Sequence, residues 1–381
     1  MEEWIKCPLG DILNFRRGHD LPKTSMIPGD IPVAGSNGII GFHNVATPIS
    51  PCITIGRSGN VGTPYIYEKC WAHNTVLYID DYKGNVPKYL YYLLKTLPLA
   101  SFGGGSAVPT LNRNHIHPLE VVFCKDIELQ KKIAGILSKI DDKIELNRQI
   151  NDNLEQQAQA LYREWFIENP KADWPTVSLS EIATFISGYS YKGNELVENS
   201  DTAMATIKNF ERNGGFKIDG YKPIVPSPKL KKEQRTQLFD ILVAHTDLTQ
   251  NAEVIGNAEI LLSKDTYKDL IFSMDLVKVN AKESFPFQFL LALLLKNPRF
   301  KSHCIGYVNG TTVLHMNKRA LPDYETIIPN LEDAQSLNAT AKAIFCQMSE
   351  NLTEISNLTT MRDALLPKLM SGELKIDEID C

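Results

Sequence analysis

The sequence predicts an α+β protein in which two globular α/β segments alternate with two long helices. Three observations predict it: a heptad pattern near the middle of the chain, a second near its end, and one motif repeated at the start of both globular segments. We expect globular segments at 1–124 and 174–330, a long helix with its linker at 125–173, and a second helix with a tail at 331–381. The two helices should form an intramolecular antiparallel coiled coil, as part of a pseudo-two-fold repeat.

Residues 127–167 contain no proline and a single glycine, which favours one helix of about 60 Å at ~1.5 Å per residue. Pro170 and Pro175 are expected to end it, and Pro367 to end the second helix. Seam residues alternate at spacings of four and three, as in a coiled coil. They are Ile133, Leu137, Ile140, Ile144, Asn147, Asn151, Leu154, Ala158, Leu161 and Trp165.

The second heptad run, at 331–366, repeats the first at an offset of 204 residues, so that Asn351 corresponds to Asn147. Two apolar stripes in one chain are best satisfied by packing on each other. The length of the segment between them leaves both directions open, and we favour the antiparallel one because internal duplication commonly gives a pseudo-two-fold axis. Asn151 would then face Asn351, a polar layer that fixes the register. The alternative is two amphipathic helices on separate cores.

An internal repeat relates the two globular segments. Trp4, Leu9, Asp11, Ile12, Phe15 and Gly18 return 170 residues later as Trp174, Leu179, Glu181, Ile182, Phe185 and Gly188. The offset grows to 204 at the helices, so the second copy carries about 34 extra residues between Gly188 and Gly310.

Within each segment, short β-like runs are broken by Gly, Pro and Asn. The first should hold strands within 32–41, 52–56, 76–79 and 118–123, a helix at 88–97 and a loop at 103–112. The second should hold a strand from Asp240, a helix at 287–295 and a loop at 309–313. Its basic cluster of Lys229, Lys231, Lys232 and Arg235 is either a solvated helical face, which we favour slightly, or a phosphate contact.

Composition narrows the class of protein. The 381 residues allow two or three domains, and 43% hydrophobic with 22% charged residues is ordinary for a globular protein. There is no apolar run of about 18 residues and no signal-like start, so we expect a cytoplasmic protein without membrane contact. Seven cysteines form no CxxC pair and eight histidines no HExxH, so neither a metal site nor a cofactor is expected.

The net charge of -5 is unevenly distributed. Each globular segment has a net charge of +1, while the helices and the tail carry the acidic excess. This distribution permits DNA binding and suggests a more basic partner.

Motifs of catalysis are missing from the sequence. It contains no GxxxxGK[ST] loop, no GxSxG elbow, no dinucleotide fingerprint and no Asn-Pro-Pro-aromatic run of an amino-methyltransferase. Catalysis by this chain alone is therefore not expected.

Several motifs in fixed order carry a family resemblance. They include PVAGSNGIIGFHN, ITIGRSGNVG, GGSAVPTLNRNHIHPLEV, DILVAHTDLTQN and MRDALLPKLMSGEL, with the long ILSKIDDKIELNRQINDNLEQQAQALYREWF helix between them. Together they resemble the specificity subunit of type I restriction-modification systems. The resemblance implies two target-recognition domains that each read one half of a bipartite DNA site. It also implies helices that space these domains and dock two methyltransferase subunits, with restriction subunits joining through the complex.

Candidate base-contacting residues follow from this resemblance, because Arg, Lys, Asn, Gln, Ser and Thr read base edges in double-stranded DNA. In the first segment they are Ser36, Asn37, Arg57, Ser58, Asn60, Asn74, Thr75, Ser106 and Thr110. In the second they are Lys192, Lys208, Asn209, His245, Thr246, Thr249, Gln250 and Thr311. The two sets differ, which predicts an asymmetric target. For each residue the alternative is a turn-forming or strand-ending role.

Two other functions remain open. The chain could be a protein-binding scaffold without sequence-specific DNA recognition, or an enzyme acting alone.

Overall fold

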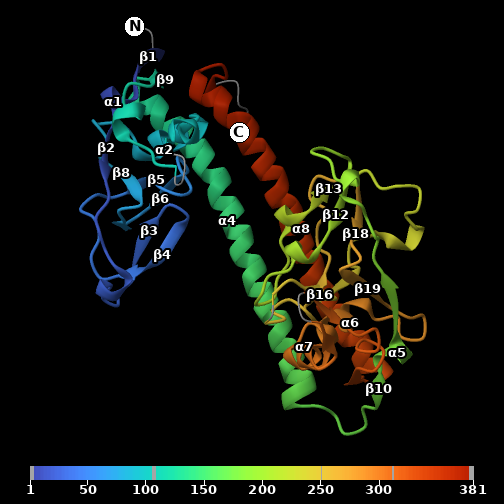
Figure 1. Ribbon diagram of the computed structural model, residues 1–381. Coiled ribbons are helices and arrows are strands. Elements are labelled where there is room, and N and C mark those ends of the chain that lie inside the picture. The colour runs from blue at the N-terminus through green and yellow to red at the C-terminus, as the bar shows by residue number, and fades with distance from the viewer. Residues whose placement is uncertain (1–3, 105–108, 250, 311–312, 377–381) are drawn as a thin grey trace. The chain divides into compact units, whose positions relative to one another are not determined.

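The computed structural model describes residues 4–104, 109–249, 251–310 and 313–376. The chain forms two compact units, one of Met1–Lys143 with Leu358–Cys381 and the other of Ile144–Asn357. Each unit contains one globular segment and a part of both long helices (Figure 1). None of the described helices combines the length and the hydropathy that crossing a membrane requires.

The first unit is built on an antiparallel sheet of order β2-β8-β5-β6, with a second sheet of order β4-β3-β7 and a separate β1-β9 pair. The core packs Phe15, Ile53 and Ile79 from the first sheet against Leu90 and Leu94 of α2. The elements are β1 Trp4–Pro8, α1 Leu9–Ile12, β2 Asn14–Arg17, β3 Ile31–Gly35, β4 Gly38–His43, β5 Cys52–Gly56, β6 Pro64–Tyr67, β7 Trp71–Ala72, β8 Val76–Asp81, α2 Pro87–Thr96, α3 Arg113–Ile116 and β9 Glu120–Cys124.

Local sequence signals explain these elements. The expected strand, turn and strand within 32–41 are β3, a tight turn, and β4. Gly38, which follows Asn37 in this turn, has a φ of +96°. The fully buried strand β5, the strand β8 and the helix α2 also lie where the sequence predicts them.

The second unit repeats this plan with additional strands. Its sheets have the orders β11-β19-β15-β17, β13-β12-β18-β14 and β16-β21-β20, and β10 pairs with β22. The elements are β10 Thr176–Ser178, α5 Leu179–Ile182, β11 Ala183–Ser187, β12 Thr202–Ala205, β13 Lys222–Pro223, β14 Arg235–Thr236, β15 Ile241–Ala244, β16 Thr246–Asp247, β17 Ala258–Ile260, β18 Asp269–Phe272, β19 Leu276–Ala281, α6 Gln288–Leu295, α7 Pro298–Ile305, β20 Val308–Asn309, β21 Leu314–Met316 and β22 Glu325–Ile327. The sequence did not predict α7 as a separate helix.

The internal repeat is confirmed by the matching sheet orders and by the two glycines of the repeated motif. A Cβ atom on Gly18 would overlap the carbonyl oxygen of His73, and one on Gly188 would overlap that of Ser273. Both backbones therefore approach a neighbouring strand more closely than any side chain allows. This close approach explains why glycine occupies the same position in both copies.

Most of the extra residues of the second unit lie in two places. Gly56 pairs with Val76 in the first unit, and Ala244 pairs with Leu276 in the second. The offset between the copies is thus 170 at Gly188, 188 at Ala244 and 200 at Leu276. One insertion therefore lies between β12 and β15, and another between β15 and β19.

The two long helices are α4, Ile127–Arg163, which continues as a π-helical turn over Glu164–Glu168, and α8, Leu331–Ser371. The expectation that Pro367 ends the second helix is wrong, because Pro367 lies inside α8. A proline inside a helix costs about 3 kcal/mol, and burying a large apolar side chain returns about 1.5–3 kcal/mol. Beyond the proline, Leu369 and Met370 are buried, so continuing the helix is favourable. The chain leaves the helix at Gly372, with a φ of +75°.

The two helices run antiparallel where they pair in the second unit. Asn351 Nδ2 donates a hydrogen bond to Asn151 Oδ1 over 2.8 Å, and Asn147 Nδ2 donates to a Glu354 carboxylate oxygen over 2.8 Å. The residue numbers rise along α4 as they fall along α8. The expected pairing of Asn151 with Asn351 is confirmed.

Candidate nucleic-acid interface

Four of the predicted residues in the first unit come together where β5 ends and β8 begins. The backbone N–H groups of Arg57 and Ser58 both donate to the Thr75 carbonyl, over 2.8 and 3.2 Å. The Arg57 guanidinium donates to the Asn74 carbonyl over 3.4 Å. A cation and three polar side chains are thus gathered at one edge of the sheet.

Two further loops join this edge. Thr110 forms a β-bridge with Ser58, and the N–H of Leu111 donates to the Arg57 carbonyl over 2.7 Å. Ser36, in the turn between β3 and β4, has its Cβ 3.5 Å from the position that a Cβ on Gly56 would take. The structure therefore brings residues from three separate loops close to Arg57.

Other residues in the first unit have partners of their own. The Asn60 side chain accepts a hydrogen bond from Thr63 Oγ1 over 3.1 Å, and the Asn74 amide donates to Asp20. His73 Nδ1 lies 3.0 Å from Thr75 Oγ1, and burial lowers the pKa of His73. Asn37 is exposed at its turn, and Ser106 lies outside the described residues. The sequence reasoning missed Asp20 and His73 because neither stands in a motif.

His245 of the second unit occupies the position of Arg57. Its N–H donates to the Asp275 carbonyl over 2.8 Å, as that of Arg57 donates to Thr75, and its carbonyl accepts from Met316 N–H over 2.9 Å. Thr246 follows it on β16 opposite His315. The two units therefore present different side chains from the same backbone position.

The electrostatics around His245 keep its imidazole neutral at neutral pH. Burial lowers the pKa of His245, His315 and Lys318 lower it further, and Asp275 opposes them. A neutral imidazole offers one hydrogen-bond donor and one acceptor. The sequence reasoning missed His315, Lys318 and Asp275, since only strand pairing places them beside His245.

Several predicted residues of the second unit serve the fold. Asn209 is fully buried; its side-chain oxygen accepts from Thr206 N–H over 2.8 Å and its amide donates to the Lys217 carbonyl over 2.6 Å. A base contact by Asn209 would require both bonds to break. Thr246 is also buried, with its hydroxyl 3.1 Å from an Asp275 carboxylate oxygen.

The remaining predicted residues of this unit differ in their surroundings. Thr249 donates through its backbone N–H and its hydroxyl to Asp247. Lys192 and Lys208 expose their side chains to solvent. Gln250 and Thr311 lie outside the described residues.

The basic cluster of the second unit is solvent-exposed, but it does not form the expected helical face. It lies on an irregular segment, a 3-10 turn over Lys232–Gln234 and the short strand β14. Arg235 pairs with Asp269 over 2.9 Å, which neutralises part of its charge. The segment cannot form a longer helix because Arg235 and Thr236 pair with β18.

Residues 1–156 match the family model described as the type I restriction modification DNA specificity domain. The chain is 27% identical over 318 residues to the type I restriction enzyme MjaIX specificity subunit of Methanocaldococcus jannaschii, with 78% of this chain and 71% of the relative covered. It is 26% identical over 443 residues to the HindI specificity subunit of Haemophilus influenzae, with 96% and 93% covered. Residues 1–156 thus match a type I DNA specificity domain, and most of the chain is similar to type I specificity subunits.

A solved structure supports the fold of this chain. The type I restriction-modification S subunit from M. genitalium aligns with a TM-score of 0.65 at 15% identity, over 96% of each chain. The resemblance to type I specificity subunits expected from the sequence motifs is confirmed by the family model and these relatives. Contacts of individual residues with DNA stay predictions.

A cavity of about 700 Å³ lies in the second unit, beside α4 and α8. Lys296 lies on its wall, 2.5 Å from a Glu259 oxygen and 3.0 Å from a Glu155 oxygen. Burial lowers the pKa of Lys296, but the two carboxylates outweigh burial and hold the pKa above its usual value. This triad is therefore an ion network in which one lysine bridges two carboxylates. Among the described residues, no group of three His, Cys, Asp or Glu side chains is arranged to hold a metal ion.

Proposed function

We propose that this chain is the DNA sequence-recognition subunit of a type I restriction-modification complex, and that each globular segment reads one half of an asymmetric, bipartite DNA site. One observation carries the proposal. Arg57 in the first unit and His245 in the second follow equivalent strands and make equivalent backbone hydrogen bonds, with Thr75 and Leu111 in the first unit and with Asp275 and Met316 in the second. A backbone arrangement that is shared by the two units but carries different side chains suits a protein that reads two different half-sites.

The chemistry of these positions supports base reading. An arginine can donate two hydrogen bonds to guanine O6 and N7, whereas a neutral histidine offers one donor and one acceptor. A good bidentate contact discriminates by about 1–3 kcal/mol against the wrong base. The two halves of the site should therefore differ in sequence.

The long helices supply the spacing in this proposal. Two readers on adjacent major-groove faces must lie about 34 Å apart, and paired helices hold such a distance where a flexible linker does not. In this scheme the recognition domains are residues 1–124 and 174–330, and the helical segments are 125–173 and 331–381.

The helices also offer a surface for methyltransferase subunits. Leu146 and Ile150 lie one turn apart on α4 and are 49% and 37% exposed. Exposed apolar side chains at this spacing suit a partner helix. We propose that two methyltransferase subunits dock on the helices and that restriction subunits join through the complex, while this chain itself is not catalytic.

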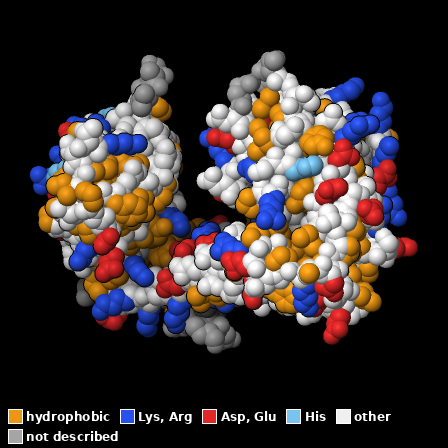
Figure 2. Space-filling model, turned by 90° about the horizontal axis from the view of Figure 1, so that it is seen from below, with side chains coloured by type: hydrophobic (Ala, Val, Ile, Leu, Met, Phe, Trp, Pro, Cys, Tyr) orange, Lys and Arg blue, Asp and Glu red, His pale blue; other side chains and the backbone are white. Residues whose placement is uncertain are grey.

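A protein-binding scaffold is the second candidate. On β4 of the first unit, Ile39 is 52% and Phe42 is 55% exposed. Figure 2 shows apolar side chains gathered on the visible face of this unit. An exposed apolar patch of this kind often marks a protein contact.

Exchanging a recognition domain separates the two candidates. The full chain is assembled with its methyltransferase, and the methylated bases are mapped by single-molecule sequencing. Replacing residues 1–124 by the same segment of a relative should change one half of the methylated motif. A motif that stays unchanged, or the absence of any motif with the wild-type chain, contradicts DNA recognition and favours the scaffold.

A point substitution refines this test. Arg57→Ala should relax one or two base pairs of the same half-site, whereas Lys131→Ala, an exposed cation on α4, should leave the motif intact.

A further inference from the structure

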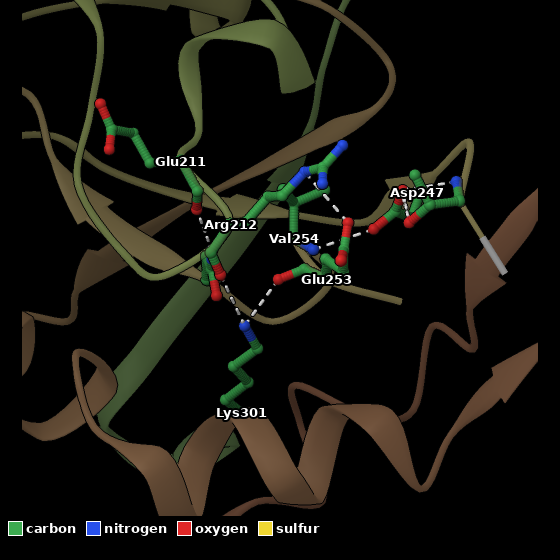
Figure 3. A network of polar contacts seen from close by, with 8 residues as sticks. Glu211, Arg212, Asp247, Glu253, Val254 and Lys301 are labelled. Carbon is green, nitrogen blue, oxygen red and sulfur yellow. Dashed lines mark hydrogen bonds and ion pairs between the residues drawn. The ribbon is translucent and has the colours of Figure 1, made fainter. Parts of the chain in front are cut away.

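A buried carboxylate shapes the chain that follows His245 in the second unit. We call this segment the Asp247 turn, residues 247–249 and 251–254. Asp247 Oδ1 accepts from the N–H of Thr249 over 2.7 Å and from its hydroxyl over 2.9 Å, while Oδ2 accepts from Val254 N–H over 2.8 Å (Figure 3). Asp247 itself is only 3% exposed. Both carboxylate oxygens are thus used to hold the two ends of the turn.

A lysine holds the turn from the opposite side. Lys301, on α7, donates to the carbonyl of Glu253 over 2.6 Å and to that of Arg212 over 3.3 Å. Arg212 Nε in turn lies 3.1 Å from a Glu253 carboxylate oxygen (Figure 3). The turn is therefore tied to a helix and to a second loop at the same point.

This network uses the parts of the second unit that the first does not share. Arg212 belongs to the insertion between β12 and β15, and the Asp247 turn belongs to the insertion between β15 and β19. Both units close the chain after this strand through an equivalent hydrogen bond, from Gly62 N–H to the Gly56 carbonyl in the first and from Gly256 N–H to the Ala244 carbonyl in the second, and only the second adds the carboxylate network. The shared fold therefore forms without such a network.

The turn presents an apolar side chain between its anchors. Leu248 is 66% exposed, although it stands between Asp247 and Thr249, whose polar groups bind each other. Among base edges in the major groove, the thymine methyl group is the contact that suits an aliphatic side chain. A side chain held rigidly before binding loses little conformational freedom on contact.

Resting on the proposed function, we propose that Asp247 and Lys301 are positioning residues that hold the Asp247 turn as a preformed reading element for the second half-site, with Leu248 presented to the DNA. The side chains of Asp247 and Lys301 act through the backbone of the turn and do not touch the bases themselves.

Competition between DNA sites tests this proposal. The full chain is assembled with its methyltransferase and given a mixture of duplexes in which each base pair of the wild-type motif is varied. Methylation of all duplexes is measured in one tube. Because preference is a ratio within one reaction, a smaller fraction of folded protein cancels, and a merely structural defect leaves the ratio unchanged.

Asp247→Asn removes an acceptor that the turn needs, since an amide nitrogen cannot accept from Val254 N–H. We expect it to reduce discrimination about tenfold to a hundredfold at one or two base pairs of the half-site read by residues 174–330. The other half should keep its wild-type preference. Lys301→Met should act at the same base pairs, and so should Leu248→Ser. Asp201→Asn, which opens an exposed ion pair with Lys268 in the same unit, is the matched control and should change nothing.

Three results would overturn the inference: wild-type preference throughout with Asp247→Asn and Lys301→Met, an equal loss in both half-sites, or an effect of Leu248→Ser at different base pairs. The wild-type reaction separates this failure from that of the proposed function. Without any bipartite preference in the wild type, the proposed function itself fails. If the wild type shows that preference and the variants do not change it, only the proposed role of the Asp247 turn fails.

Discussion

Asn351 on α8 donates a hydrogen bond to Asn151 on α4, and both side chains are buried. Asn151 donates in turn to the Met348 carbonyl over 3.2 Å, and Gln347 donates to Asn351 Oδ1 over 3.0 Å. A chain of amide hydrogen bonds thus crosses a seam that is otherwise largely apolar. Such a layer specifies register at a cost in stability.

Replacing both asparagines separates these two effects. Asn151→Leu with Asn351→Leu should raise the free energy of unfolding by about 1 kcal/mol and loosen the helix register, because paired removal leaves neither amide unsatisfied. Asn351→Leu alone should lower it by about 1–3 kcal/mol, since Asn151 Oδ1 then stays buried without its donor. Calorimetry of the full chain measures the stability of the double and of the single variant. A double variant that melts below the wild type contradicts this assignment.

Removing the charge of Lys296 should destabilise the second unit. Lys296→Met leaves Glu259, which is 3% exposed, without its cation, and should lower the free energy of unfolding by about 3–5 kcal/mol. Urea unfolding measures the change. Lys268→Met breaks an ion pair of similar length at the surface and should have no measurable effect, because water solvates both partners. Equal effects of the two substitutions would show that the buried triad contributes no more to stability than the exposed ion pair.

Gly18 and Gly188 should tolerate no side chain. Gly18→Ala should destabilise the first unit by about 3 kcal/mol, since its methyl group overlaps the His73 carbonyl and the backbone must shift. Gly188→Ala should do the same to the second unit through Ser273. Gly135→Ala is the control: no atom lies within 4 Å of the added carbon and alanine favours the helix by about 1 kcal/mol. Denaturant unfolding measures the free energy of unfolding of the three variants. Equal changes in all three would contradict this account.

Acid should weaken the second unit through His245. The pKa of His245 is lowered from its ordinary 6.5 by burial and by His315 and Lys318. The unfolded chain therefore binds more protons between the folded pKa and about 6.5, so stability falls as pH drops through that window. His245→Gln should reduce the loss of unfolding free energy between about pH 7.5 and 5. Urea unfolding at several pH values checks this, and an unchanged loss would contradict it. The first unit should lose stability in acid independently, because burial also lowers the pKa of His73 and His117.

The long-range plan was readable because it rests on periodicity. The seam rows of both helices follow from a spacing of 3.5 residues per turn, and the pairing of Asn151 with Asn351 follows once the internal duplication favours the antiparallel direction. The repeated glycine was visible in the sequence as well, but the close backbone approach that requires it was not. Pro367 shows where local rules fail, since the burial of Leu369 and Met370 outweighs the missing hydrogen bond.

The candidate interface was only partly readable. Arg57 and Thr75 were singled out as polar residues beside strands, and strand pairing does bring them together. Asn209 has the same local character, yet it is fully buried, because its partners come from a loop whose path the sequence does not show.

By itself the sequence determined the family, the duplication and the two long helices, since each is written in motif order or in the period of apolar residues. The tertiary structure decided that His245 stands where Arg57 stands, because insertions of two lengths hide this equivalence until the strands are paired. It also decided the role of Asp247. A carboxylate becomes the anchor of a turn only when the fold buries it and brings two backbone N–H groups to its oxygens.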